Sequence, residues 1–128
     1  MGNPVGSLEV PNVLHARKRL LLEMSQRQKE ILIGCILGDA YISLLGKIRI
    51  EQSTKQRAYV DWKYQELRSL CYPAQPREII HILPTGKEYT SVFFLLRQYF
   101  RSWRSIFYDG RTKIFPHNLP VSPLSLAV

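Results

Sequence analysis

The stretch that decides the fold is Ile31-Leu32-Ile33-Gly34-Cys35-Ile36-Leu37-Gly38-Asp39-Ala40-Tyr41-Ile42. It is apolar on nearly every side, which is typical of a buried helix. Gly34 and Gly38 lie four residues apart on one face of this helix, where they let another backbone approach closely. Asp39 then places a single carboxylate at the edge of a packed seam. That is an unusual place for a charge unless a cation or a reacting phosphate lies beside it, although a packed helix whose aspartate merely caps a turn has the same pattern.

The composition fits one globular domain that binds a polyanion. The chain has 128 residues, of which 45% are hydrophobic, and this is enough for a core and argues against disorder. Lysine and arginine outnumber aspartate and glutamate by 18 to 10, which gives a net charge of +8. This excess favours nucleic acid over a membrane surface as the partner, although a merely soluble basic protein would share it.

Several patterns bear on the compartment. No apolar run reaches the ~20 residues of a membrane span, and the N-terminus lacks the apolar region of a secretion signal. Cys35 and Cys71 have no metal-binding spacing, so both are expected to be small core residues in a reducing compartment. We therefore expect an intracellular protein without a membrane partner.

Helix and strand patterns alternate in a fixed order along the chain. Residues 1–24 are weakly patterned and form an N-terminal extension, with a short turn of helix expected near Arg17 to Leu22. Ser25 and Gln28 form a capping box that begins a helix expected over residues 26–39. Further strands and helices follow: strands at 41–45 and 47–53, a helix at 56–71, strands at 77–83 and 89–95, and a helix at 97–109. This order predicts an α+β fold, a four-stranded antiparallel sheet with helices packed on one side.

The last of these helices has a clear apolar stripe. Its aromatic and aliphatic residues recur at helical spacing, and three arginines fall on the opposite face: Arg97, Arg101 and Arg104. We expect that arginine face to be exposed. Gly110 is favoured as the residue that ends the helix.

The strand expected at 47–53 has two different faces. Ile48 and Ile50 alternate with four polar residues, which are Lys47, Arg49, Glu51 and Ser53. An antiparallel ribbon with a polar outer face fits the major groove of DNA. An ordinary half-buried strand whose polar face meets water has the same pattern.

Three segments carry a resemblance to a known family. Leu32 to Ala40 resembles the LAGLIDADG motif of homing endonucleases, although Ala40 replaces its usual final glycine. Gln52-Ser53-Thr54-Lys55-Gln56-Arg57-Ala58-Tyr59 resembles the segment that opens the second helix of the family. Lys113 to Leu119 resembles the segment after its third helix. The resemblance spans about residues 28 to 128 and implies a LAGLIDADG-type half-domain over 25–121, whose sheet forms a DNA-binding saddle.

The end of the chain extends this resemblance. Residues 122–128 resemble the start of the second motif helix in two-motif members, with Ser122 as its N-cap and Pro123 in its first turn. The chain therefore looks like the N-terminal half of a two-motif protein, truncated at the start of the second motif.

The resemblance implies site-specific hydrolysis of DNA assisted by a divalent metal, Mg²⁺ or Mn²⁺. Asp39 and Lys113 correspond to catalytic residues, and the Asp39 carboxylate and the Gly38 carbonyl are expected metal ligands. Lys113 would stabilise charge or position the attacking water, unless it is a plain phosphate contact. Gly34 and Gly38 are the expected helix-pairing interface with a second LAGLIDADG half. With one carboxylate and an exposed Gly34/Gly38 face, the chain alone is expected to dimerise, aggregate or cleave poorly.

Double-stranded DNA is the implied partner, bound through outward side chains of the sheet. The residues expected to read bases in the first ribbon are Tyr41, Ser43, Lys47, Arg49, Glu51 and Ser53. Those in the second ribbon are Arg77, His81, Tyr89 and Ser91. Phosphate contacts are expected from Lys55, Arg57 and Lys87, and such contacts position a protein on DNA without reading its sequence.

Other functions remain compatible with the same residues. An RNA maturase that assists the splicing of an intron and a catalytically decayed DNA-binding protein would both have this fold. An unrelated basic α+β module is a third alternative, for which Asp39 would have no role. Members of the resembled family are often encoded within organelle introns, so the resemblance implies a mitochondrial or plastid location.

Overall fold

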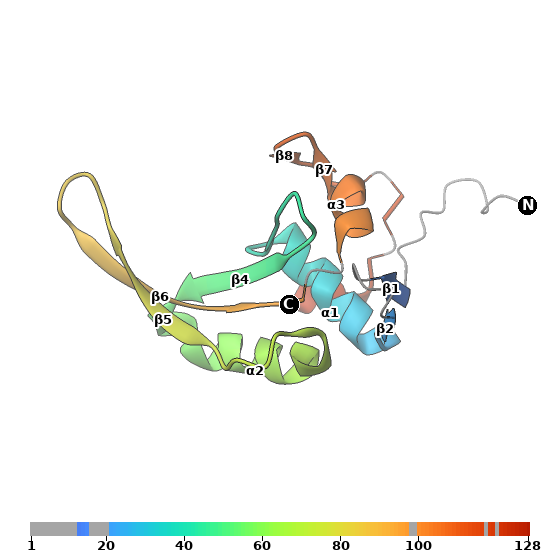
Figure 1. Cartoon of the computed structure of the whole chain (residues 1–128), viewed down its shortest axis with the longest axis horizontal. Coiled ribbons are helices and arrows are strands. Elements are labelled where there is room, and N and C mark those ends of the chain that lie inside the picture. Colours follow the sequence, from blue (N-terminus) through green and yellow to red (C-terminus); the bar gives the residue numbers. More distant parts are fainter. Residues whose placement is uncertain (1–12, 16–20, 98–99, 117, 120) are drawn as a thin grey trace, which may run out of the picture.

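The computed structural model describes residues 13–15, 21–97, 100–116, 118–119 and 121–128 (Figure 1). Its centre is an antiparallel sheet with the strand order β3-β4-β6-β5. The strands are β3 (Tyr41–Ile42), β4 (Ile48–Ser53), β5 (Arg77–Ile82) and β6 (Glu88–Leu95). The predicted α+β class and four-stranded antiparallel sheet are therefore confirmed, although the first strand ends at residue 42 instead of 45.

One face of the sheet carries the core. Ile48 and Ile50 of β4 are fully buried, and they pair across the sheet with Ile42 of β3 and Phe94 of β6, respectively. Helix α2 packs on β4 and β6, and α1 packs against α2 (Figure 1). The β5–β6 hairpin extends beyond these helices, and its Ile80 and Ile82 are 61% and 70% exposed. The helices therefore cover only the part of the sheet near β4.

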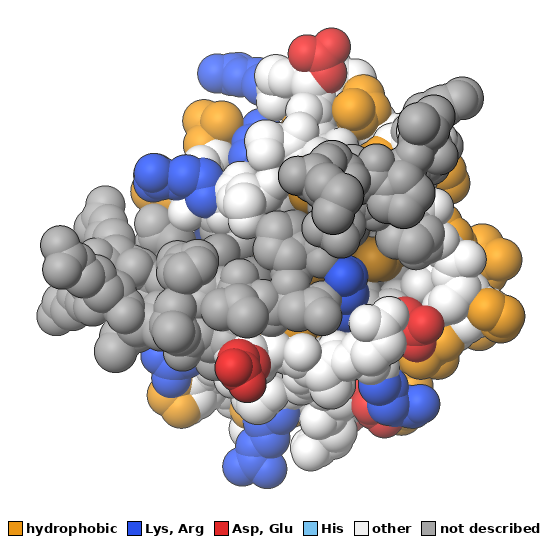
Figure 2. All heavy atoms as spheres, turned by 90° about the vertical axis from the view of Figure 1, so that its right-hand side faces the viewer, with side chains coloured by type: hydrophobic (Ala, Val, Ile, Leu, Met, Phe, Trp, Pro, Cys, Tyr) orange, Lys and Arg blue, Asp and Glu red, His pale blue; other side chains and the backbone are white. Residues whose placement is uncertain are grey.

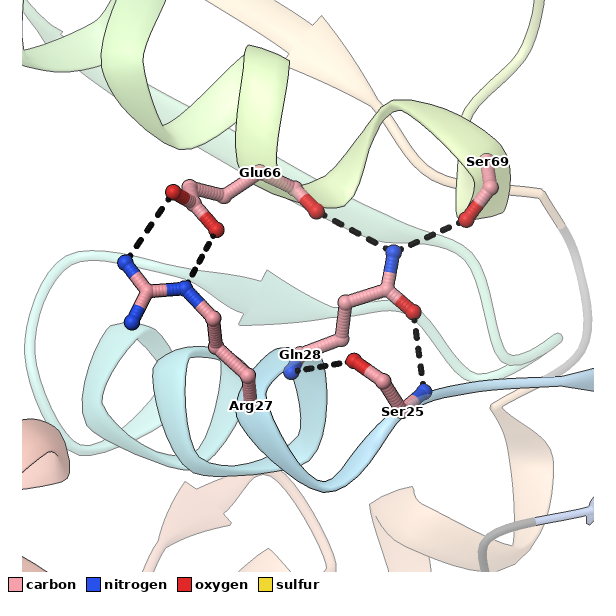
Figure 3. Close-up of polar contacts among 5 residues, drawn as sticks. All are labelled: Ser25, Arg27, Gln28, Glu66 and Ser69. Carbon is pink, nitrogen blue, oxygen red and sulfur yellow. Dashed lines mark hydrogen bonds and ion pairs between the residues drawn. The ribbon is translucent and has the colours of Figure 1, made fainter.

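Helix α1 (Gln26–Leu37) begins at the predicted capping box. The Ser25 hydroxyl accepts from the Gln28 backbone, and the Gln28 side-chain oxygen accepts from the Ser25 backbone, both at 3.0 Å (Figure 3). The Gln28 amide nitrogen then donates to the Glu66 carbonyl at 3.1 Å and to Ser69 at 2.8 Å. Arg27 pairs with the Glu66 carboxylate in the same place. The cap of α1 is thus also its connection to the second helix.

The end of α1 differs from the prediction. The helix ends at Leu37, and the Gly38 backbone N–H closes it by donating to the carbonyls of Gly34 and Cys35. Asp39 therefore lies in the turn between α1 and β3, exposed, and not in the helix itself.

The second helical segment is confirmed with small changes in its ends. A 3-10 turn η1 (Thr54–Gln56), α2 (Arg57–Leu67) and a further turn η2 (Arg68–Leu70) follow one another without a gap. Val60, Tyr64 and Leu67 recur at helical spacing and are buried in the core. Lys63 is buried with them, which the sequence pattern did not predict.

The third helix is shorter than predicted. Helix α3 spans Arg101–Phe107, and the chain then forms a small hairpin of β7 (Tyr108–Asp109) and β8 (Thr112–Lys113). Gly110, with φ of 61°, occupies the turn of this hairpin instead of ending the helix. The helix stops because the Tyr108 side chain is buried against β3, where its hydroxyl accepts from the Ile42 backbone at 3.1 Å.

The expectation that the arginines of this helix are exposed is wrong for Arg104. This side chain is buried and donates to the carbonyls of Ile42 at 2.6 Å and Gly110 at 2.8 Å. Its guanidinium also lies over the Tyr108 ring, 4.2 Å from the centroid. The arginine therefore connects α3 to β3 and to the β7–β8 hairpin.

The last helix, α4 (Pro123–Ala127), packs against α1. Ser122 caps it as predicted, and the Ser125 hydroxyl donates to the Glu30 carbonyl of α1 at 2.7 Å. A Cβ on Gly34 would lie 2.3 Å from the Ser125 carbonyl oxygen. The expectation of an exposed face at Gly34 is therefore wrong, because this chain's own α4 covers it. Gly38 is exposed, and a Cβ there would meet only the carbonyls of Gly34 and Cys35.

The N-terminal segment has some regular structure. β1 (Val13–His15) and β2 (Leu21–Glu23) form an antiparallel pair, so Leu21 and Leu22 lie in a strand and not in the expected turn of helix. Residues 1–12 and 16–20 of the expected extension lie outside the described residues. No helix in the described part of the chain is long and apolar enough to cross a membrane.

Candidate functional site

Asp39 stands at the start of a chain of polar contacts. The Gln52 side-chain nitrogen donates to the Asp39 carboxylate at 3.1 Å, and the Lys63 ammonium donates to the Gln52 side-chain oxygen at 3.0 Å. A lysine can only donate and a carboxylate can only accept, so the two partners together fix the orientation of the amide. Asp39 thus receives an oriented donor from β4, which is itself held by α2.

Lys63 is the buried end of this chain of contacts. Its side chain is only 4% exposed, and its ammonium lies 4.3 Å from the centroid of the Tyr59 ring. Within the described residues its hydrogen-bond partner is the neutral Gln52 amide. The buried Cys35 nearby is not a reactive thiolate, because burial raises its pKa to about 11.

Lys113 approaches the same turn from β8. Its ammonium donates to the carbonyls of Gly38 at 3.1 Å and Ala40 at 2.7 Å, on either side of Asp39 in the sequence. Partial burial lowers the pKa of Lys113, and the negative charge of Asp39 opposes this shift. The structure therefore brings together three residues that the resemblance singles out: Gly38, Asp39 and Lys113.

The metal chemistry of this turn is limited by its donors. The Asp39 carboxylate and the Gly38 carbonyl are hard oxygen ligands, of the kind that Mg²⁺ and Mn²⁺ prefer. No group of three or more histidine, cysteine, aspartate or glutamate side chains that could hold a metal occurs among the described residues. These two oxygens therefore fit a divalent ion whose remaining ligands are water, phosphate or a carboxylate from a second half.

The polar residues predicted to face outward do share the face of the sheet opposite the helices. Tyr41, Arg49 and Leu95 are neighbours across three strands, and so are Glu51, Phe93 and Arg77. The same register adds the predicted residues Ser53, Ser91, His81 and Tyr89 to this face. The predicted Ser43 and Lys47 close the turn between β3 and β4, where the Ser43 backbone N–H donates to the Lys47 carbonyl at 2.8 Å. We call the side of the sheet that these residues form the outer face.

Four predicted residues on the outer face are linked to one another by hydrogen bonds and ion pairs. Glu51 accepts from Arg49 and from Ser91, and the His81 ring lies 2.6 Å from its second oxygen. Partial burial raises the pKa of the Glu51 carboxyl, but the hydrogen bonds from Ser91, Arg49 and His81 outweigh this effect and hold it below its ordinary value. Glu51 is thus a charged centre within the outer face.

Phe93 is an outer-face residue that the sequence analysis missed. The guanidinium of Arg49 lies 3.9 Å from the centroid of its ring, and that of Arg77 lies 5.3 Å away. The alternation that selected Tyr89 and Ser91 continues to Phe93, so the signal was present. Gln52 and Lys63 were also missed. Each is a polar residue at a position where the strand or helix pattern requires an apolar one, and this mismatch is the signal that could have found it.

The three predicted phosphate contacts lie apart from this network. Lys55 is exposed in η1, and Lys87 is exposed at the turn of the β5–β6 hairpin. Arg57 forms ion pairs with Glu78 at 3.1 Å and with Asp61 at 3.6 Å. It is therefore less free to meet an external anion than the two lysines.

The described basic residues at the opposite end of the molecule are spread over the face that Figure 2 shows. Figure 2 shows the end that lies away from the β5–β6 hairpin, where lysine and arginine side chains are scattered and interspersed with acidic ones. An ordered arrangement of charged and aromatic groups is seen instead on the outer face, where Arg49, Arg77 and Phe93 stack.

Comparisons with a family model and with solved structures both find similarity. A family model described as "LAGLIDADG DNA endonuclease family" matches residues 29–128. Among solved structures, the chain is similar to that of the homing endonuclease I-WcaI bound to its DNA recognition sequence, with a TM-score of 0.71 and 23% sequence identity. The match covers 80% of this chain and 49% of the other, so this chain spans about half the length of that enzyme. A search of curated proteins gives no match.

Proposed function

Because this chain belongs to the LAGLIDADG DNA endonuclease family, we propose that it is one half of a site-specific DNA endonuclease in which Asp39 is a catalytic residue. The observation that carries the proposal is the meeting of Asp39, Gln52 and Lys113 at the turn after α1. These groups come from three separate parts of the chain. Such a convergence of a carboxylate with oriented donors and a lysine suits the hydrolysis of a phosphodiester.

Each residue of the turn has a definite task in this proposal. The Asp39 carboxylate and the Gly38 carbonyl hold a divalent ion, Mg²⁺ or Mn²⁺, which when bound supplies an activated water and neutralises phosphate charge. Gln52 keeps the carboxylate in one orientation. Lys113 places a positive charge beside the scissile phosphate, where it stabilises the transition state.

The outer face is the proposed DNA-binding surface. A twisted antiparallel ribbon with polar side chains can enter the major groove, and Arg49 and Arg77 are suited to contact guanine there. Lys55 and Lys87 lie at its margins and contact phosphates, which fixes the register of the protein on the duplex.

A second half completes the enzyme in this proposal. The described residues offer one carboxylate at the turn, whereas cutting both strands requires a second one at the other scissile phosphate. Packing of α4 on Gly34 shows that the small residue admits a close helix, and Gly38 and Asp39 remain exposed beside it. The second half supplies its carboxylate at this exposed edge.

Substitution of Asp39 by Asn tests the proposal. We expect the variant to lose Mg²⁺-dependent nicking or cleavage of duplex DNA while its affinity for DNA is unchanged, because the carboxylate binds the metal and not the bases. Glu23→Gln removes an exposed carboxylate from β2, outside the proposed site, and should leave both properties intact. Cleavage by Asp39→Asn at the wild-type rate would contradict the proposal.

A metal-binding measurement covers the case in which the isolated half does not cut. Mn²⁺ added to the DNA complex should broaden the NMR signals of residues near Asp39 in the wild type and not in Asp39→Asn. Binding of intron RNA in preference to duplex DNA would instead favour a maturase, and sequence-specific binding without metal would favour a decayed DNA-binding protein. A mitochondrial or plastid location is proposed only from the family resemblance.

A further inference from the structure

Glu51 occupies an unexpected place for an acidic residue, the middle of the outer face. DNA presents negative phosphates, so a carboxylate there opposes binding. A glutamate can still read DNA by accepting a hydrogen bond from the amino group of cytosine. That use requires a free carboxylate oxygen directed away from the protein.

Both oxygens of Glu51 are already engaged by neighbouring side chains. One oxygen accepts from Nε of Arg49 at 2.7 Å and forms an ion pair with its Nη2 at 2.6 Å. The other accepts from the Ser91 hydroxyl and lies 2.6 Å from Nε2 of His81. The Glu51 side chain is only 23% exposed. Its carboxylate therefore has little capacity left for a base.

Arg49 is held in one orientation by these contacts. Glu51 takes two of its nitrogens, and the Phe93 ring lies against one face of the guanidinium at 3.9 Å. An unrestrained arginine side chain would lose considerable rotamer freedom on binding. The restrained guanidinium instead presents its remaining N–H groups in a fixed direction, which suits the two acceptors of guanine.

His81 is fixed in a similar way. Because a carboxylate only accepts hydrogen bonds, the short contact to Glu51 places a proton on Nε2. The ring also stacks on Tyr89, with centroids 4.7 Å apart and 19° between the planes. In the neutral ring Nδ1 is then an acceptor, which suits the amino group of adenine or cytosine.

We propose that Glu51 is a positioning residue that contacts no base itself and that sets the sequence specificity of Arg49 and His81 by holding both side chains in place. The inference rests on the proposed binding of duplex DNA by the outer face. It has a distinctive consequence: removing the Glu51 charge strengthens binding to unrelated DNA and weakens discrimination at the base pairs that Arg49 and His81 contact.

Binding by Glu51→Gln tests this inference. The preferred duplex is first selected with the wild-type chain from a randomised pool, and affinities are then measured for that duplex, for its single-base-pair variants and for an unrelated duplex. We expect Glu51→Gln to lose about tenfold in discrimination at the same base pairs that Arg49→Ala and His81→Ala affect. Its affinity for the unrelated duplex should rise, because repulsion of the phosphates is reduced.

Two further variants separate charge from position. Glu88→Gln removes an exposed carboxylate from the start of β6, outside the network, and should leave discrimination unchanged. Ser91→Ala keeps the Glu51 charge and its contact with Arg49, and should weaken discrimination only at the base pair assigned to His81. The Arg49 Nε–H signal in NMR spectra should exchange slowly in the wild type and rapidly in Glu51→Gln, which reports the loss of restraint in a folded protein.

The possible failures are distinguishable. If Glu51→Gln alters discrimination at a base pair that neither Arg49→Ala nor His81→Ala affects, Glu51 reads DNA directly. If Glu51→Gln retains full discrimination, the network of hydrogen bonds around Glu51 does not contribute to specificity. Either result overturns the inference and leaves the proposed function standing. Failure of the wild type to select any duplex overturns the proposed function, and the inference falls with it.

Discussion

At the scale of single residues, Lys63 is the side chain whose position is hardest to explain by stability. Taking an ammonium group out of water is costly, and the hydrogen bond that Lys63 makes is to a neutral amide, Gln52. The contact with the Tyr59 ring offsets only part of that cost. A methionine of similar length would fill the same space without a charge. The lysine is therefore better explained by the orientation it imposes on Gln52 and, through Gln52, on Asp39.

This explanation predicts opposite effects of Lys63→Met on stability and activity. We expect the free energy of unfolding to rise by about 1 kcal/mol, because a buried unpaired charge is removed. Metal-dependent cleavage should fall by about tenfold, because the Gln52 amide is no longer held in one orientation. Urea denaturation and a cleavage assay measure the two effects, with Arg68→Met, at an exposed position of η2, as the control. A variant that loses stability and activity together would indicate a purely structural role.

The depressed pKa of Glu51 predicts a specific dependence of stability on pH. In the folded state its pKa lies below the ordinary 4.5, so the unfolded chain binds the proton more readily. The stabilisation is fully present above pH 4.5 and is lost as the pH falls through the lowered pKa. We expect the stability difference between the wild type and Glu51→Gln to be constant from about pH 5 to pH 7 and to shrink in more acidic solution. A difference that grows on acidification would contradict this assignment.

At the scale of elements, Arg104 shows how one buried side chain can hold three segments together. It lies on α3 and donates to a carbonyl of β3 and to another in the β7–β8 turn. The short hairpin carries Lys113, so the position of that lysine beside Asp39 depends on the arginine. Arg104 therefore links α3 to the candidate site through hydrogen bonds to the backbones of β3 and the β7–β8 turn.

Truncation of Arg104 should accordingly be severe. We expect Arg104→Ala to lower the free energy of unfolding by about 3 kcal/mol, because two charge-assisted hydrogen bonds disappear and two carbonyls are left without a partner. Arg101→Ala, on an exposed position of the same helix, should change it by less than about 0.5 kcal/mol. Equilibrium unfolding in urea measures both variants, and equal effects would show that Arg104 acts only as surface charge.

The same element shows what local patterns can and cannot predict. Alternation in the strands identified the residues of the outer face, because a strand exposes every second side chain regardless of its neighbours. Helical spacing likewise found the buried positions of α2. It failed for Arg104 and Lys63, because burial of a polar residue depends on which carbonyl or amide another element places opposite it. The β7–β8 hairpin was missed because its strands are only two residues long.

At the scale of the whole molecule, part of the surface expected to pair with a second half is uncovered. Gly34 is covered by α4. Gly38 and Asp39, which follow the end of α1, remain exposed. The Leu126 side chain on α4 is 75% exposed. A second half would cover this surface in the proposed enzyme. The sequence motif pointed to such a surface, but covering of Gly34 by the same chain depends on the tertiary packing of residues 122–128.

Association of the isolated chain follows from that surface. We expect sedimentation to show dimers or larger species at micromolar concentration, and duplex DNA to be nicked or cut poorly, because each copy brings a single carboxylate. Leu126→Lys should shift the distribution toward the monomer, since it places a charge on the accessible apolar surface. A stable monomer that makes double-strand breaks would contradict the expectation.

The β5–β6 hairpin has a mechanical consequence. Beyond the helices it is supported by the hydrogen bonds between its own two strands, and Ile80 and Ile82 on its reverse side lack a packed layer beneath them. We expect such a ribbon to be rigid where it joins the core and more flexible toward its tip. Bending at the tip would disturb few core contacts, so in the proposed DNA complex the hairpin would follow the curvature and width of the groove while the turn at Asp39 stays fixed.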